Sequence, residues 1–162
     1  MATHDHNADN STLRRLVAGF EQFRTAHFST DADLFDSLLE GQRPDVMVIA
    51  CSDSRSDPAI ICGARPGELF VVRNVAALVP PFAADGRPHG TAAALEFGVV
   101  ALGVHHVIVL GHSFCAGVRC LLGHDHAAHG YTFVSDWVGV AAEVRVEMEG
   151  LVTEAEGGLV AR

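Results

Sequence analysis

Two short apolar runs in this chain end at residues that bind soft metals. Val46–Ala50 leads directly into Cys51, and Val107–Leu110 is followed by His112 and Cys115. Neither run alternates with polar residues, which is typical of strands that helices cover on both faces. Helix-like segments separate the runs. The pattern therefore predicts an α/β fold, with a mostly parallel central sheet and crossover helices.

The segments around these runs complete the alternation. Ser11 has the character of an N-cap for a helix that runs to about Phe28, and Pro58 suits the first turn of another helix. Leu69–Val72 predicts a further strand. Other helices are expected at Asp31–Glu40, Thr91–Leu102, Ala116–Leu122 and 132–162. A chain of 162 residues favours one domain. Its expected parts are a polar tail (1–10), N-terminal helices (11–40), a core (42–122) and a C-terminal helix with a short tail (132–162).

Charge and hydropathy exclude several classes of partner. The formal net charge is -9, from 11 Lys and Arg against 20 Asp and Glu, which disfavours nucleic acids and anionic membrane surfaces. No segment approaches the roughly 18 consecutive apolar residues of a membrane span, and Met1–Asn10 is polar. We expect a cytoplasmic protein that binds neither nucleic acid nor membrane.

Cysteine and histidine together predict a metal site. The carboxyl ends of parallel strands meet at one edge of a sheet, so Cys51 should lie near His112 and Cys115. A single buried Cys is usually only a small core residue, but one His with two Cys suits zinc, and three protein ligands leave a position for water. No role is assigned to Cys62 and Cys120. The cluster His124, His126 and His129 has a spacing that fits no rigid ligand set.

A family resemblance rests on these same motifs. Cys51-Ser-Asp-Ser-Arg55 with His112-Ser-Phe-Cys115 resembles the signature of the β-class carbonic anhydrases. Three more motifs agree in order and spacing, within roughly Gln42 to Leu122: Pro66-Gly67-Glu68, Val72-Arg73-Asn74-Val75-Ala76 and His89-Gly90-Thr91. The resemblance implies one zinc ion per chain, held by Cys51, His112 and Cys115. It also implies reversible hydration of carbon dioxide to bicarbonate.

The resemblance assigns catalytic roles to Asp53 and Arg55. Asp53 would accept a hydrogen bond from the water on the metal, and Arg55 would keep Asp53 ionised. In some members of the family the matching aspartate instead becomes a fourth metal ligand in a closed state. Val48 stands where members with a bicarbonate-regulated closed state carry Trp, although Arg73 matches their arginine. We therefore expect an open site that resembles the plant-like subgroup.

That subgroup also implies substrate contacts and an oligomer. Gln42 matches a glutamine that donates a hydrogen bond to the substrate oxygen, and Phe70 and Val75 match an apolar wall. Phe97 stands where the subgroup has Tyr. Some contacts come from a neighbouring subunit, so a homodimer or a dimer of dimers is expected, with the N-terminal helix packing on the partner. The family continues past this chain's end at Arg162, so its C-terminal helix and edge strand are expected to be missing.

Two other functions fit the same residues. Hydrolysis of carbon disulfide or carbonyl sulfide on this scaffold would require only a different access route. A non-catalytic zinc protein is the other alternative, but a purely structural zinc site has no use for the pair of Asp53 and Arg55. A dinucleotide-binding domain is excluded, because the first strand is not followed by the Gly-x-Gly-x-x-Gly turn.

Overall fold

The computed structural model describes residues 6–28, 32–123 and 130–147. The chain divides into two compact units, Met1–Gln42 and Arg43–Arg162, and each is treated by itself. The prediction that the whole chain forms one domain stays a prediction. Within the described residues, no helix has both the length and the apolar character that a membrane crossing requires.

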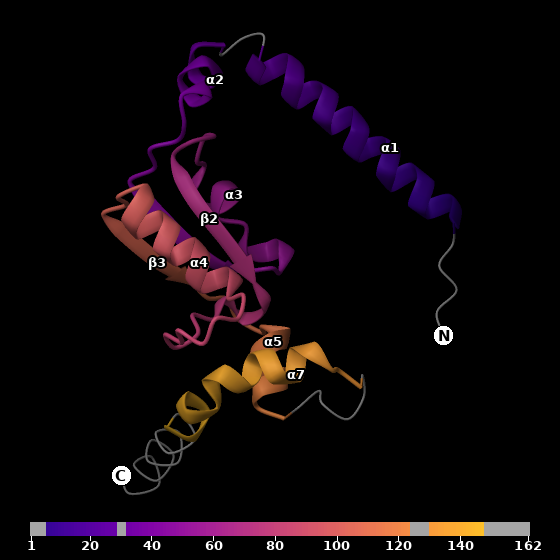
Figure 1. The fold of residues 1–162 in the computed structure, drawn as a ribbon. Helices are drawn as coiled ribbons and strands as arrows, with labels where there is room; N and C mark the ends of the chain where they lie inside the picture. Colours follow the sequence, from indigo (N-terminus) through magenta and orange to yellow (C-terminus); the bar gives the residue numbers. More distant parts are fainter. Residues whose placement is uncertain (1–5, 29–31, 124–129, 148–162) are drawn as a thin grey trace, which may run out of the picture. The chain divides into compact units, whose positions relative to one another are not determined.

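The first unit is helical (Figure 1). Its helices are α1 (His6–Phe23), a π-helical turn (Arg24–Phe28) and α2 (Ala32–Leu39). The expectation that the first helix starts at Ser11 is wrong, because α1 starts five residues earlier. Residues 6–10 contain neither Pro nor Gly, so the helix continues backwards through them. The rings of Phe28 and Phe35 stack with centroids 4.2 Å apart, and Phe23 meets both edge-on.

The second unit contains a parallel sheet. Its strands are β1 (Val46–Cys51), β2 (Leu69–Asn74) and β3 (His106–Leu110), in the order β2-β1-β3. Val46 pairs with Leu69 on one side and with His106 on the other. This arrangement confirms the predicted α/β fold. It also places the carboxyl ends of all three strands at one edge of the sheet.

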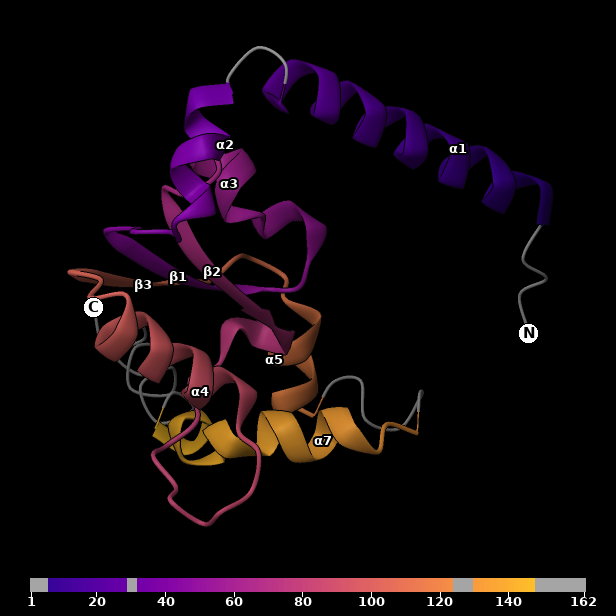
Figure 2. The same ribbon diagram turned by 45° about the horizontal axis from the view of Figure 1, so that its top comes forward.

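Helices lie on both faces of the sheet. Figure 2 shows the sheet nearly edge-on, with α3 (Pro58–Cys62) above it and α4 (Gly90–Glu96) below it. The Asp57 carboxylate caps α3 by accepting hydrogen bonds from the amides of Ala59 and Ile60, and Pro58 occupies the first turn. The helix α4 passes into a π-helical turn (Phe97–Ala101), so the predicted helix up to Leu102 is present.

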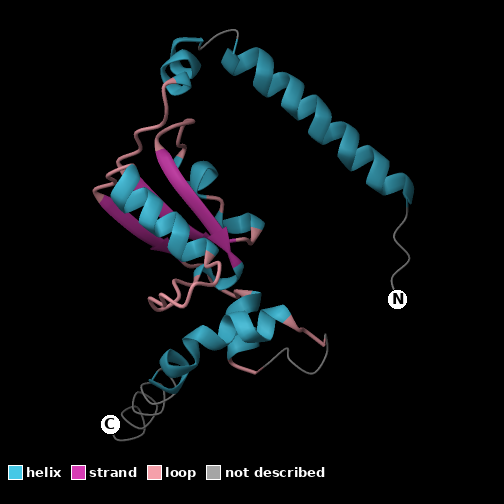
Figure 3. Ribbon diagram, viewed as in Figure 1, coloured by secondary structure: helices cyan, strands magenta, loops and turns pink. Residues whose placement is uncertain are grey.

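Beyond β3 the described part of the chain consists of helices joined by loops (Figure 3). The helix α5 (Ala116–Leu121) packs against α7 (Phe133–Val138), which continues as a 3-10 turn (Gly139–Ala141) and helix to residue 147. The rest of the predicted C-terminal helix and the His124, His126 and His129 cluster lie outside the described residues.

Burial differs sharply between the strands. In β1 the side chains of Met47, Ile49 and Ala50 are fully buried. The expectation that β3 is buried on both faces is wrong, because every residue from His106 to Val109 is exposed. Edge position alone does not explain this, because β2 is also an edge strand and is mostly half-buried. The helix α4 packs against β2, whereas no helix among the described residues packs as closely against β3.

Candidate metal centre

Three ligand-type side chains converge at the carboxyl edge of the sheet. Cys51 is the last residue of β1, His112 follows β3 by two residues, and Cys115 is the N-cap of α5. The two sulfur atoms are 3.8 Å apart, and the ligand atoms of all three residues lie within 4.8 Å of one another. Residues separated by 64 positions in the sequence thus form one cluster, as the parallel topology requires.

The histidine in this cluster is oriented as a metal ligand. Its Nδ1 lies 3.0 Å from the carbonyl oxygen of Ser113, and because that oxygen can only accept, Nδ1 carries the proton and Nε2 presents its lone pair. The Nε2 atom is buried without a well-aligned hydrogen-bond partner. An unsatisfied buried nitrogen facing two thiols is the donor set that zinc prefers. The residues therefore fit a zinc ion.

The two thiols have different electrostatic surroundings. Burial alone would raise the pKa of the Cys51 thiol, but it is outweighed by hydrogen bonds from the backbone amides of Asp53 and Ala76 and by the interaction with the His112 side chain, so the pKa is lowered. The Cys51 sulfur in turn attracts the imidazole proton and raises the pKa of His112. Burial raises the pKa of the Cys115 thiol. The lowered pKa of Cys51 and the raised pKa of His112 thus share one cause, the interaction between the two side chains.

Asp53 and Arg55 form a bidentate ion pair beside the cluster. Arg55 Nε and Nη2 donate to the two carboxylate oxygens of Asp53 at 2.9 and 2.8 Å, and the Arg55 amide donates to the first of them at 2.9 Å. These bonds hold the pKa of the Asp53 carboxyl well below its usual range. Asp53 remains a hydrogen-bond acceptor at any physiological pH, and its side chain is 25% exposed.

Two residues behind the cluster have structural roles that were not predicted from the sequence. Arg73, at the end of β2, donates to the backbone carbonyls of Cys51 and Asp53 and to the Asp57 carboxylate. An Arg in an otherwise apolar strand was a signal for such a role. Ser56 is 1% exposed, and its hydroxyl lies 3.0 Å from the Cys51 carbonyl and 2.9 Å from the Asp53 carbonyl. Sequence alone gives no sign that this serine is buried.

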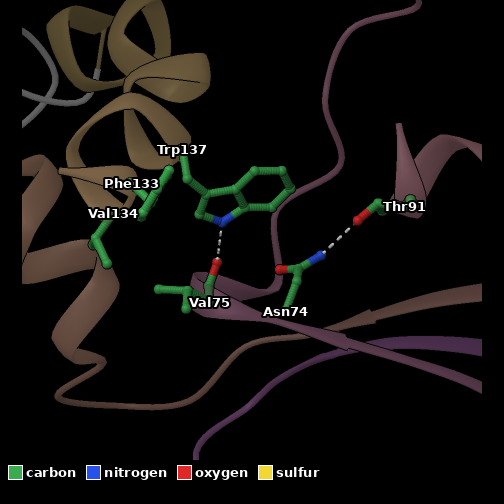
Figure 4. Close-up of a pocket in the computed structure, with 7 residues that line it drawn as sticks. Asn74, Val75, Thr91, Phe133, Val134 and Trp137 are labelled. Carbon is green, nitrogen blue, oxygen red and sulfur yellow. Dashed lines mark hydrogen bonds between the residues drawn. The ribbon is translucent and has the colours of Figure 1, made fainter. Parts of the chain in front are cut away.

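A short turn, Val75–Ala77, joins the cluster to α7. The Trp137 indole donates to the Val75 carbonyl at 2.7 Å, and the Asn74 amide donates to the Thr91 hydroxyl at 3.2 Å (Figure 4). A hollow of about 360 Å³ lies here, lined by Asn74, Val75, Gly90, Thr91, Phe133, Val134 and Trp137. Ala76 and Ala77 have positive φ angles of 69° and 54°, an unfavourable conformation for residues other than Gly. This strain lies next to the cluster, since Ala76 packs against it.

The predicted substrate contacts are divided between separate places. Val75 follows Asn74, which pairs in register with Cys51, and precedes Ala76, which packs against the cluster. Phe70 and Phe97 pack on each other with ring centroids 5.8 Å apart, but Phe70 pairs with Met47, four positions before Cys51, or about 13 Å along the strand. Gln42 is exposed and is the last residue of the first unit. Within one chain the second unit thus brings together the metal cluster, the ion pair and Val75, but not Phe70 and Phe97.

Comparisons with known proteins agree with this geometry. The family model described as carbonic anhydrase matches residues 46–158. The carbonic anhydrase of Synechococcus elongatus is 41% identical over 134 residues, which are 82% of this chain and 48% of that protein. The chain thus spans about half the length of this curated relative.

Two solved structures have the same arrangement. The β-carbonic anhydrase CcaA superposes with a TM-score of 0.73 at 37% identity, covering 83% of this chain and 64% of CcaA. A tetrameric β-carbonic anhydrase of the ascomycete Sordaria macrospora superposes with a TM-score of 0.63 at 30% identity, covering 92% of this chain and 68% of that one.

Proposed function

Because the chain belongs to the β-class carbonic anhydrase family, we propose that it catalyses the reversible hydration of carbon dioxide to bicarbonate and a proton. The observation that carries the proposal is the cluster of Cys51, His112 and Cys115 with the pair of Asp53 and Arg55 beside it. A purely structural zinc site would not need that ion pair.

The metal ligands and their chemistry follow from the donor set. Cys51 and Cys115 would hold zinc through their thiolates, and His112 through Nε2. Zinc bound by three protein ligands is a Lewis acid that lowers the pKa of a bound water towards neutrality. The amides of Asp53 and Ala76 donate to the Cys51 sulfur, which stabilises its negative charge and keeps it available as a ligand.

Asp53 orients the reacting water in this proposal. Its carboxylate accepts a hydrogen bond from the water, so that an oxygen lone pair points at the carbon of carbon dioxide. Arg55 keeps that carboxylate ionised and occupies both of its oxygens, which favours the open state in which Asp53 is not a metal ligand. Val75 presents an apolar wall, which suits an uncharged substrate of low polarity. The carbon gains the hydroxyl group of the water to give bicarbonate, and the other proton of the water leaves for the buffer.

We propose that the remaining substrate contacts require a second copy of the chain. Gln42 would donate to the substrate oxygen, and Phe70 and Phe97 would complete the apolar wall, each from a partner subunit. Four apolar side chains of α1 are between 51% and 62% exposed: Leu13, Leu16, Val17 and Phe20. Their helical spacing suits packing on a partner, in a homodimer or dimer of dimers. We also propose a cytoplasmic location, because a reducing compartment keeps two thiols as close as Cys51 and Cys115 from forming a disulfide.

Stopped-flow measurement of carbon dioxide hydration tests the proposal, with zinc per chain and molecular mass determined on the same sample. We expect one zinc per chain, hydration that Cys115→Ala abolishes together with the zinc, and a mass of at least two chains. Carbon disulfide and carbonyl sulfide serve as comparison substrates. If either is turned over faster than carbon dioxide, the proposed substrate is wrong and the protein is a hydrolase of that sulfur compound. Zinc-loaded protein without turnover on any of the three would contradict an enzymatic role.

A further inference from the structure

Arg73 occupies an unusual position for a charged residue. It is the one charged residue of β2 (Leu69–Asn74), and it pairs in register with Ala50, immediately before the metal-ligand position Cys51. Its side chain is only 28% exposed. A guanidinium held at this depth needs acceptors for its donors, and the structure supplies three.

All three acceptors belong to the segment that follows β1. Arg73 Nε donates to the Cys51 carbonyl at 3.0 Å, Nη2 to the Asp53 carbonyl at 2.6 Å, and Nη1 to the Asp57 carboxylate at 2.7 Å. Three separate nitrogens of one rigid fork therefore fix three points of the segment 51–57. Asp57 also caps α3, so Arg73 ties the end of β1 and the start of α3 to β2.

The same segment carries the functional side chains on its other side. Cys51 and Asp53 turn their carbonyls to Arg73, while the Asp53 amide donates to the Cys51 sulfur and the Asp53 carboxylate pairs with Arg55. Arg73 touches neither the sulfur nor that carboxylate. It holds the backbone from which both extend.

We propose that Arg73 is a positioning residue: it fixes the segment 51–57 so that the Cys51 sulfur and the Asp53 carboxylate keep their places relative to His112 and Cys115. Its effect on turnover rests on the proposed function. Its effect on the segment does not. A lysine keeps the charge but has one nitrogen on a flexible stem, so it cannot span three acceptors set apart by a planar fork.

Arg73→Lys tests the proposal, with Arg65→Lys as the matched control. Arg65 is exposed and pairs with Glu68, and no contact joins its side chain to the segment 51–57 among the described residues. For Arg73→Lys we expect kcat to fall about 10- to 100-fold, as for other groups that orient a metal site, with KM little changed. Hydrogen exchange of the 51–57 amides should speed up, while exchange in α7 stays as in the parent. Arg65→Lys should match the parent in every readout.

Each outcome decides for or against the proposal. Unchanged exchange in 51–57 overturns it, whatever happens to activity, and so does a kcat loss that only follows a lower folded fraction. If the parent hydrates no carbon dioxide, the proposed function fails, but faster exchange of 51–57 in Arg73→Lys still supports the positioning role. Asp57→Asn provides a second variant, because it weakens one of the three contacts and should speed exchange less than Arg73→Lys.

Discussion

At the scale of single residues, the two thiols differ in the direction of their pKa shifts, although each sulfur accepts from two backbone amides. The Cys51 sulfur accepts hydrogen bonds from the backbone amides of Asp53 and Ala76. These bonds lower the pKa of the Cys51 thiol, although burial alone would raise it. The Cys115 sulfur also receives amides, from Val118 and Gly117, but burial and the neighbouring Cys51 keep its pKa raised. Cys51 is therefore the thiol that ionises first, and Cys115 is the one that metal binding must deprotonate.

Removing the Asp53 carboxylate should separate metal binding from turnover. Asp53→Asn leaves Cys51, His112 and Cys115 in place, so zinc per chain should stay at the parent value. Because the uncharged Asn side chain is a weaker hydrogen-bond acceptor for the reacting water than the carboxylate, kcat should fall about 10- to 100-fold. Asp85→Asn is the control, since Asp85 also accepts from an arginine, Arg87, but in an exposed loop. Loss of zinc in Asp53→Asn, or full activity in it, would contradict the assigned role.

Removing Arg55 should change the titration of Asp53. The Arg55 guanidinium holds the pKa of the Asp53 carboxyl below its usual range, so in Arg55→Met this pKa should rise towards about 4. The folded pKa of the parent lies below the unfolded one. The pair therefore stabilises the fold above about pH 4, and this contribution is lost as the pH falls through the folded pKa. The stability difference between parent and variant should thus be largest near neutral pH. Carboxyl carbon shifts of Asp53 followed by NMR measure the pKa directly, and equal titration in both proteins would refute the expectation.

At the scale of elements, α5 and the turn Val75–Ala77 approach each other at Gly117. A methyl group on Gly117 would lie 2.7 Å from Val75 Cγ1 and 2.8 Å from the Ala76 methyl. Both are closer than side-chain carbons can come. Gly117 is therefore required where the helix that Cys115 caps meets the strained turn behind Cys51.

Gly117→Ala should accordingly destabilise the protein. We expect a loss of about 1 to 3 kcal/mol in the free energy of unfolding, as for overpacked sites, and weaker zinc binding because α5 carries Cys115. Gly139→Ala is the matched control, because nothing lies within 4 Å of its added methyl. Denaturant unfolding and zinc titration measure the two effects. If the two variants are equally stable, the turn Val75–Ala77 can move to make room for the methyl group, and the predicted destabilisation is wrong.

The sequence predicted these elements better than it predicted their surroundings. The strands, their parallel direction and the meeting of the metal ligands at one edge of the sheet were predicted from apolar runs that lead into Cys51 and His112. Such short, unbroken apolar runs separated by helices are typical of a parallel sheet. The start of α1 did not, since the polar residues 6–10 carry no breaker and look like a tail. Which groups accept from Arg73 and Ser56 could not be predicted either, because the acceptors depend on the path of the backbone between β1 and α3.

At the scale of the whole molecule, a metal would link two distant parts of the chain. The ligands Cys51 and Cys115 are 64 residues apart, one at the end of β1 and the other at the start of α5. A ligand that binds only the folded state stabilises it, by about 2.7 kcal/mol at 100 times its Kd. Chelation should therefore lower the Tm, and added zinc should restore it. Cys115→Ser should melt at the same temperature with and without chelator, and a chelator effect of parental size in that variant would indicate a different metal site.

The exposed β3 strand has a consequence for the behaviour of the chain in solution. Val107, Ile108 and Val109 are 44%, 48% and 57% exposed, and none of the five β3 residues is Lys, Arg, Asp or Glu, the side chains that commonly protect such edges. An apolar edge of this kind can recruit strands from other chains. Association through this edge should then limit the solubility of the protein. Ile108→Lys should raise the highest soluble concentration, measured after centrifugation, without disturbing the metal cluster, which lies beyond the carboxyl ends of β1 and β3.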